Sequence, residues 1–247
     1  MTAFEIIYAV GVLLLAYFIR GISGFGSGLV SVPLLALVFP LSLVVPAILL
    51  LDFTASLVLG GVNFRQVRWD EVKPLVPFGM IGVALGTTLL VSLPREPLLI
   101  ALGIFILIFA LRSLLNLHGD KPVSRKWAAP ASLAGGTVGG MFGTGGPPYV
   151  IYLQHRLQDK GELRATLSGV FFLEGLFRIG SFVAAGLLVQ SEVWLGFLLG
   201  LPIVFAGLYG GSHVHTGLSQ AQMVRVIGIL LLLSGLSVFV KALGASD

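Results

Sequence analysis

Cysteine is absent from this 247-residue sequence, and only 11% of its residues are charged. The absence of cysteine excludes disulfides, thiolate metal ligands and cysteine nucleophiles. Soluble domains carry about 25% charged residues, so this chain lacks the polar surface that a water-exposed globule needs. A long polar stretch is also missing, which leaves no segment for a separate domain outside a membrane.

Hydrophobic residues are abundant, at 56% of the chain, and the mean hydropathy is +1.01. They gather in successive runs with short polar breaks between them. A run of about 20 apolar residues crosses the ~30 Å hydrocarbon core as a helix. The sequence therefore predicts an all-α polytopic membrane protein. The predicted apolar segments are 4–20, 29–39, 42–61, 75–93, 97–116, 128–153, 165–189, 193–211 and 223–243.

The formal net charge of +4 is compatible with nucleic acid as a binding partner. Nine of the 15 lysine and arginine residues, however, lie in the short loops 62–74, 117–127 and 154–164. Cytoplasmic loops of membrane proteins carry such an excess of lysine and arginine. We therefore expect the lipid bilayer, and no nucleic acid, as the partner of this charge, and we expect a cell inner membrane location.

An internal repeat is visible in the sequence. Adding 125 to a residue number pairs Trp69 with Trp194 and Pro77 with Pro202. Adding 117 pairs the string Phe-Gly-Ser-Gly at 25–28 with Phe-Gly-Thr-Gly at 142–145. The sequence thus predicts two homologous halves. They are a first transmembrane repeat at 1–116, a cytoplasmic linker at 117–127 and a second transmembrane repeat at 128–247.

The basic loops also indicate how the halves are oriented. Only the apolar segment 128–153 separates the loops 117–127 and 154–164, and a single crossing would place one of them outside. A hairpin broken at 143–148 keeps both inside. By the repeat, 4–39 is a matching hairpin broken at 20–28. Each half then has a glycine-broken hairpin plus three spans. Three spans are an odd number of crossings, so the two halves lie antiparallel in the membrane. This is an inverted repeat, and its substrate site is expected where the repeats meet. The alternative is eight simple spans with parallel halves.

The two glycine strings are the first candidate site. Glycine permits positive φ and close approach of a ligand, and a helix broken in mid-membrane presents amide donors to an anion. Pro147 and Pro148 suit the first turn of the returning helix, where a missing N–H costs nothing. The alternative is that these glycines serve only helix packing. The predicted substrate-binding residues here are Gly26, Ser27, Gly28, Gly143, Thr144 and Gly145.

Ionisable residues inside apolar segments are the second candidate site, because such groups are costly at membrane depth. We expect Asp52 and Glu174 to serve in proton coupling and Arg178 to bind substrate. Glu174 and Arg178 lie four residues apart on one helix face, so a structural ion pair is the alternative. Arg20, beside the first glycine string, either attracts anions or reaches the headgroups.

Enzyme activity is not expected. The string Gly-Ile-Ser-Gly at 21–24 matches that of intramembrane serine proteases, but these need a histidine at the same depth. His213 and His215 lie in a polar connection and are assigned no role. A phosphate-binding loop of the type G-x-x-x-x-G-K-[S/T] is absent from the sequence. We predict no catalytic residue, no metal and no cofactor.

The glycine-rich strings at 21–28 and 139–148, together with the length, duplication and loop pattern, resemble the TauE/SafE family of sulfite exporters. The resemblance covers nearly the whole chain. It implies an inner-membrane transporter of sulfite, sulfonates or related organosulfur anions that is coupled to protons, with a substrate site near the glycine strings.

Three functions remain open from the sequence. The first is a secondary transporter of a small anion, in which helix termini and hydroxyls coordinate the substrate and a carboxyl takes up the proton. The second is a passive anion channel with re-entrant hairpins. The third is a membrane assembly subunit without transport, which the charges inside the membrane disfavour.

Overall fold

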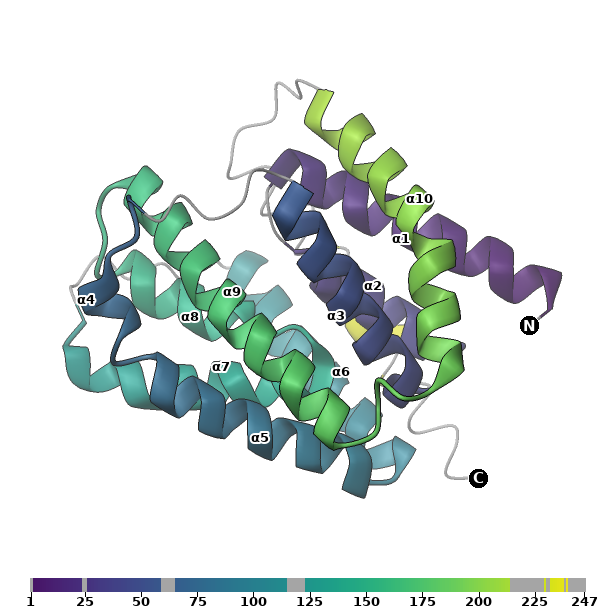
Figure 1. The fold of residues 1–247 in the computed structure, drawn as a ribbon, viewed down its shortest axis with the longest axis horizontal. Coiled ribbons are helices and arrows are strands. Elements are labelled where there is room, and N and C mark those ends of the chain that lie inside the picture. Colours follow the sequence, from purple (N-terminus) through teal and green to yellow (C-terminus); the bar gives the residue numbers. More distant parts are fainter. Residues whose placement is uncertain are drawn as a thin grey trace. The chain divides into compact units, whose positions relative to one another are not determined.

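A computed structural model of the chain describes residues 2–23, 26–58, 65–114, 123–213, 229, 232–237 and 239. Within these residues the chain is helical with short turns and contains no strand. The helices (Figure 1) are α1 (Ala3–Ser23), α2 (Ser27–Ala36), α3 (Leu41–Val58), α4 (Trp69–Val72), α5 (Val76–Ser92), α6 (Arg95–Leu114), the 3₁₀ turn η1 (Arg125–Trp127), α7 (Ala128–Phe142), α8 (Gly146–Gln154), α9 (Lys160–Ala184) and α10 (Ser191–His213).

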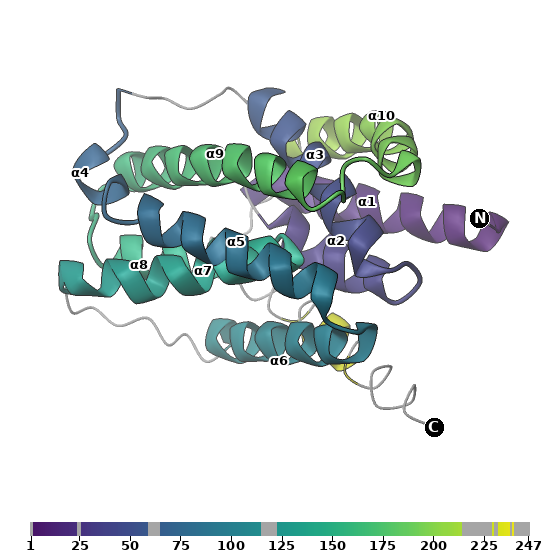
Figure 2. The same cartoon turned by 60° about the horizontal axis from the view of Figure 1, so that its bottom comes forward.

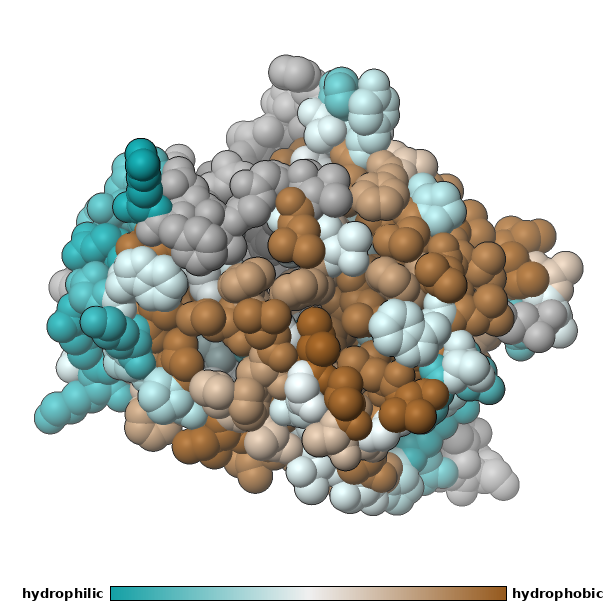
Figure 3. All heavy atoms as spheres, viewed as in Figure 1, coloured by the Kyte–Doolittle hydropathy of each residue, from teal (hydrophilic) through white to brown (hydrophobic). Residues whose placement is uncertain are grey.

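Several of the described helices have the composition of membrane spans, and three of them also have the length. Three stretches, Ala3–Ile22, Gly161–Ala184 and Ser191–His213, are each long and apolar enough to cross a bilayer. Shorter apolar helices, among them Leu41–Leu57 and Val76–Ser92, lie between them. Figure 3 shows hydrophobic side chains over most of the visible face, with hydrophilic ones gathered where Figure 1 places α4. The prediction of an all-α protein with several membrane helices is confirmed.

Helix boundaries follow the predicted apolar segments closely, with one clear difference. The helix α9 starts at Lys160, which is five residues before the predicted start of the segment 165–189. Asp159 caps this helix, and its Oδ1 accepts a hydrogen bond of 2.8 Å from the Glu162 amide. A capping aspartate satisfies an amide that the first helical turn leaves free, so the helix can begin in the polar loop. The predicted segment 223–243 falls mostly outside the described residues.

The chain divides into two compact units. Unit 1 comprises 1–52, 93–117 and 191–247, and unit 2 comprises 53–92 and 118–190. Each unit therefore contains helices from both predicted repeats. Unit 1 holds α1, α2, α6, α10 and most of α3, and unit 2 holds α4, α5, α7, α8 and α9.

Each unit contains one pair of helices in direct backbone contact. In unit 2, α5 runs along α7 (Figure 2), and a Cβ added to Gly86 would collide with the carbonyl oxygen of Thr137. In unit 1, α10 runs along α1, and a Cβ added to Gly211 would collide with the carbonyl oxygen of Phe18. Small residues allow such approach between membrane helices. Gly211 is the residue that the 125-residue spacing pairs with Gly86, so the two contacts occupy equivalent sequence positions.

Candidate functional site

The first chain break separates α1 from α2. α1 ends at Ser23 and α2 begins at Ser27, with Gly26 in the left-handed conformation at φ 94°. The first α2 hydrogen bond runs from the Val30 amide to the Gly26 carbonyl, at 3.3 Å. The amides of the three residues between have no acceptor within the helix. Gly24 and Phe25 of the predicted string lie outside the described residues.

The second chain break separates α7 from α8 in unit 2. α7 ends at Phe142, Gly143 is left-handed at φ 71°, and α8 begins at Gly146. Pro147 and Pro148 follow directly, and proline has no N–H. The first turn of α8 therefore offers the amide of Gly146 and not those of the next two residues. The prolines start the helix as predicted, but they also remove two of the donors that an anion would use.

Four side chains meet beside the first break, all within unit 1. Asp52 Oδ1 accepts hydrogen bonds from the Tyr17 hydroxyl at 2.8 Å, from Ser27 Oγ at 2.7 Å and from Arg20 Nη1 at 2.5 Å. Arg20 Nη1 also donates to Ser27 Oγ at 2.9 Å. Tyr17 is 0% exposed, Ser27 2% and Arg20 8%. Asp52 thus has partners on two other helices, which its own apolar segment did not reveal.

A second acidic residue lies beside the second break, within unit 2. Glu174 Oε1 would be 2.5 Å from a Cβ added to Gly139, and the Cα of Gly145 is also next to that position. The Tyr149 hydroxyl donates a hydrogen bond of 3.2 Å to the carbonyl oxygen of Ser132, and Tyr149 and Glu174 line the same small cavity.

Two oxygens beside the second break are buried and have no hydrogen-bond partner among the described residues. They are Thr144 Oγ1 and Glu174 Oε1. Thr144 as a whole is 3% exposed. A cavity of about 10 Å³ lies against Glu174 and Tyr149. This is about the volume that one water molecule requires, and it is too small for a sulfur oxyanion.

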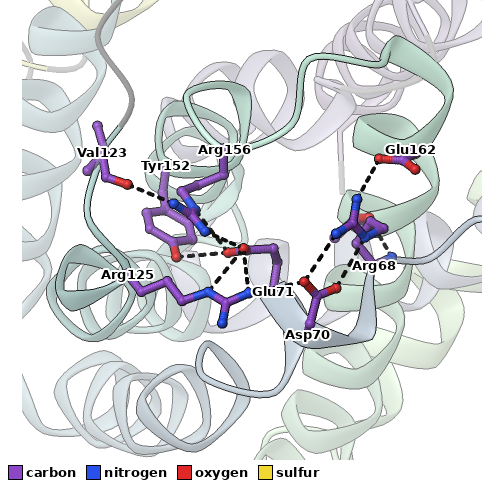
Figure 4. Close-up of polar contacts among 9 residues, drawn as sticks. Arg68, Asp70, Glu71, Val123, Arg125, Tyr152, Arg156 and Glu162 are labelled. Carbon is purple, nitrogen blue, oxygen red and sulfur yellow. Dashed lines mark hydrogen bonds and ion pairs between the residues drawn. The ribbon is translucent and has the colours of Figure 1, made fainter.

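A third polar group, the Glu71 cluster, joins the three basic loops at one end of unit 2 (Figure 4). The Oε1 oxygen of Glu71, on α4, accepts two hydrogen bonds. One comes from Arg156 Nη2 at 2.6 Å and the other from Arg125 Nη2 at 3.1 Å. The Tyr152 hydroxyl donates to Glu71 Oε2 at 3.1 Å. Glu71 is 3% exposed. Because Arg125 precedes α7 and Arg156 follows α8, the α7–α8 segment leaves and returns to the same end of this unit.

The acidic side chains of α4 have lowered pKa values. Burial alone would raise the pKa of Glu71, but hydrogen bonds from Arg156, Arg125 and Tyr152 outweigh it and hold this pKa below its usual value of 4.5. The hydrogen bond from Arg68 lowers the pKa of Asp70. Arg68 also reaches Glu162 of α9 at 3.1 Å. The cluster is therefore ionised at neutral pH and joins α4 to the polar end of α9.

Comparison with known proteins identifies the family. The model of the sulfite exporter TauE/SafE family matches residues 9–238. The chain belongs to the TauE/SafE family. This agrees with the resemblance carried by the glycine strings, and it makes the chain a membrane transporter rather than an enzyme.

Two relatives of this TauE/SafE protein are also named as transporters. The probable inner membrane transporter protein TsaS of Comamonas testosteroni is 32% identical over 193 residues, which cover 77% of this chain and 80% of TsaS. A probable membrane transporter protein of Haemophilus influenzae is 26% identical over 253 residues, covering 92% of this chain and 95% of that protein. No solved structure matches the chain.

Sequence reasoning missed three residues of this TauE/SafE protein that the structure places at its polar groups. Tyr17 donates to Asp52, Tyr149 lines the cavity beside Glu174, and Glu71 joins three loops. Tyrosines in an apolar run carry no distinctive pattern. Glu71, next to Asp70 in a charged loop, has the sequence context of a solvent-exposed residue. A search for acids that could balance the three basic loops would have pointed to it.

Proposed function

We propose that this TauE/SafE protein is a secondary transporter that carries a small sulfur oxyanion, sulfite or a sulfonate, across the inner membrane with proton coupling. The family description names sulfite export. The relative TsaS is named an inner membrane transporter. The family description supports the class of the substrate, and the name of the relative supports the inner membrane.

The observation that carries the proposal is the pair of unpartnered oxygens beside the second break, Thr144 Oγ1 and Glu174 Oε1. Buried polar atoms in folded proteins nearly always have partners, so each exception needs an explanation. An anion that accepts the Thr144 hydroxyl proton in a hydrogen bond supplies one partner. A transported proton on Glu174 supplies the other, since carboxyls at membrane depth serve as proton relays.

The remaining predicted residues divide between the two units. In unit 1, Ser27 and the α2 amides at Gly28 and Leu29 offer donors. In unit 2, Arg178, Thr144 and the amide of Gly145 do so, whereas the Gly143 amide already donates to the Gly139 carbonyl. A micromolar site needs about 8 kcal/mol, and each hydrogen bond to a charged group contributes about 1.5–3 kcal/mol. About four such bonds within one unit suffice, even without the two amides that the prolines of α8 remove.

The inverted repeat is part of the proposal. The predicted repeats 1–116 and 128–247 contribute equivalent helices to the two units, so that α5 pairs with α7 and α10 pairs with α1. The contacts at Gly86 and Gly211 and the left-handed glycines Gly26 and Gly143 support the equivalence. Transporters built from inverted repeats bind substrate beside broken helices at the midplane.

The test is anion uptake by purified protein in proteoliposomes. Ser27→Ala combined with Thr144→Ala is expected to reduce sulfite or sulfonate uptake at least tenfold, about 1.4 kcal/mol. Glu174→Gln is expected to abolish accumulation driven by a proton gradient. Glu162→Gln is the matched control, because it makes the same change on the same helix in an exposed position. Unchanged uptake of every tested oxyanion by the double variant contradicts the site.

A passive anion channel gives a different outcome in the same assay. A coupled transporter accumulates the anion against its gradient, and a protonophore collapses that accumulation. A channel only equilibrates the anion, and Glu174→Gln changes its rate little. Of the two acids, Glu174 is assigned the proton because one of its oxygens lacks a partner, whereas the Asp52 carboxylate is held by Arg20.

A further inference from the structure

The Asp52 carboxylate accepts hydrogen bonds from three side chains that together have the composition of an anion-binding site. A guanidinium, a phenol and an alcohol, from Arg20, Tyr17 and Ser27, all donate to its Oδ1. Each of the three donor residues is at least nine-tenths buried. Arginine with hydroxyl donors is a common means of binding carboxylates and other oxyanions, because these hydrogen bonds are charge-assisted.

The acid and its donors come from different parts of unit 1. Tyr17 and Arg20 lie on α1 and Ser27 is the first residue of α2, whereas Asp52 lies on α3. The donors are also bonded to one another, since Arg20 Nη1 donates to Ser27 Oγ at 2.9 Å. Ser31 Oγ in turn donates to the Ser27 carbonyl at 2.8 Å. Two of the three donors, Arg20 and Ser27, are therefore held together by their own contact, independently of the acid.

Asp52 is the more accessible partner of the ion pair. Its side chain is 23% exposed, compared with 10% for Arg20. An anion that reaches this group meets the carboxylate before it meets the donors. A second negative charge cannot be bound there while the first remains, because the guanidinium balances only one.

We infer that Tyr17, Arg20 and Ser27, the Arg20 site, bind one oxygen of a substrate oxyanion, and that Asp52 is a resident anion which the substrate displaces. The inference rests on the proposed function, in which the substrate is a sulfite or sulfonate anion. Exchange of one anion for another keeps the buried guanidinium neutralised throughout. Asp52 is then a competitor of the substrate and not the carrier of its proton.

The decisive variant is Asp52→Asn, which keeps the size of the side chain and removes its charge. Isothermal titration calorimetry of the full chain in detergent, with sulfite and ethanesulfonate as probes, measures the consequence. Asp52→Asn is expected to lower the Kd for these anions at least about tenfold. Asp70→Asn, the same substitution at the surface, is the matched control and is expected to leave the Kd unchanged. Adding Arg20→Gln to Asp52→Asn is expected to remove the gain.

The outcomes separate this inference from the proposed function. If Asp52→Asn binds the probes no more tightly than the natural chain, or does not bind them, the resident-anion inference is overturned. A gain that persists after Arg20→Gln overturns it as well, because the anion then binds elsewhere. The proposed function fails in another measurement, when proteoliposomes of the natural chain take up no sulfur oxyanion.

A second variant covers the case in which Asp52→Asn does not fold well. Asp52→Ala leaves a space beside the Arg20 site that formate fits, since formate is the carboxyl group of the missing side chain. Formate is expected to raise the unfolding temperature of Asp52→Ala more than that of the natural chain or of Asp70→Ala. Equal shifts in all three proteins contradict the inference.

Discussion

The guanidinium of Arg156 lies 2.6 Å from a carboxylate oxygen of Glu71, although 85 residues separate the two in sequence. The same oxygen accepts a hydrogen bond from Arg125, so the loop before α7 and the loop after α8 meet at one carboxylate. A chain that simply crossed the membrane between these arginines would place them on opposite sides. The contact therefore supports a segment 128–153 that turns back on itself.

Loss of the Glu71 charge is expected to destabilise the protein. Glu71→Gln leaves Arg125 and Arg156 without their common acceptor, and removing one member of a buried ion pair is strongly unfavourable. Because Arg125 and Arg156 are 55% and 23% exposed, water compensates in part, and we expect a loss of about 1–3 kcal/mol. Thermal unfolding in detergent measures it. Glu162→Gln, in an exposed pair, is the control and is expected to change the unfolding temperature little.

The lowered pKa of Glu71 predicts how stability depends on pH. A carboxyl whose pKa is lowered by folding stabilises the protein above its unfolded value, here 4.5, and this contribution is lost as the pH falls through the folded value. The unfolding temperature of the natural chain is therefore expected to fall steeply below pH 4.5. Glu71→Gln is expected to fall less steeply over the same range. Equal slopes for the two proteins contradict the assignment.

The position of the three basic loops can be tested by labelling. Because the chain has no cysteine, Lys73→Cys, Lys126→Cys and Gln158→Cys each introduce a single reactive thiol at an exposed residue. An impermeant maleimide is expected to label all three in inverted membrane vesicles and none in intact cells. Labelling of Gln158→Cys from the opposite side to Lys126→Cys would support eight simple spans.

Close packing of α5 and α7 makes Gly86 intolerant of a larger residue. Gly86→Ala places a methyl group on the carbonyl oxygen of Thr137, and neither backbone can move without separating the helices. We expect a loss of about 1–3 kcal/mol, seen as a lower unfolding temperature. Gly180→Ala on α9 is the matched control, since nothing lies within 4 Å of its added Cβ. It is expected to cause no loss.

Gly139→Ala is expected to affect transport more than stability. Its methyl group meets Glu174 Oε1, the end of a flexible side chain that can rotate away. The unfolding temperature is expected to change little, while proton-driven uptake falls at least about tenfold because the carboxyl is displaced. An unfolding temperature as low as that of Gly86→Ala, with normal uptake by the remaining folded protein, assigns Gly139 a packing role only.

Much of the fold was predictable because it depends on local composition. Apolar runs fixed the helices, and glycine and proline marked the breaks at Gly26 and Gly143 correctly. The basic loops indicated that 128–153 returns to its starting side. The cap at Asp159 was missed, because a capped first turn can be polar. The division of the chain into two units was also not foreseen, since pairing of α5 with α7 depends on contacts between distant glycines.

The sequence pointed to polar residues beside the two breaks but not to the side chains that contact them. Asp52 and Glu174 stood out as acids in apolar helices. Their contacts with Tyr17 and Tyr149 could not be foreseen, because a tyrosine is as common in a membrane helix without such a contact. The effect of Pro147 and Pro148 was open to sequence reasoning, since the missing amides follow from the residue type alone.

The backbone contact between α5 and α7 also limits how this protein can move. Where carbonyl groups of one helix lie against glycines of the other, a shift by a single residue would bring Val83 or Thr137 to a place that has no room for a side chain. The two helices consequently move as one rigid element. Any rearrangement during a transport cycle has to leave this pair intact and take place by rotation at other points of the chain.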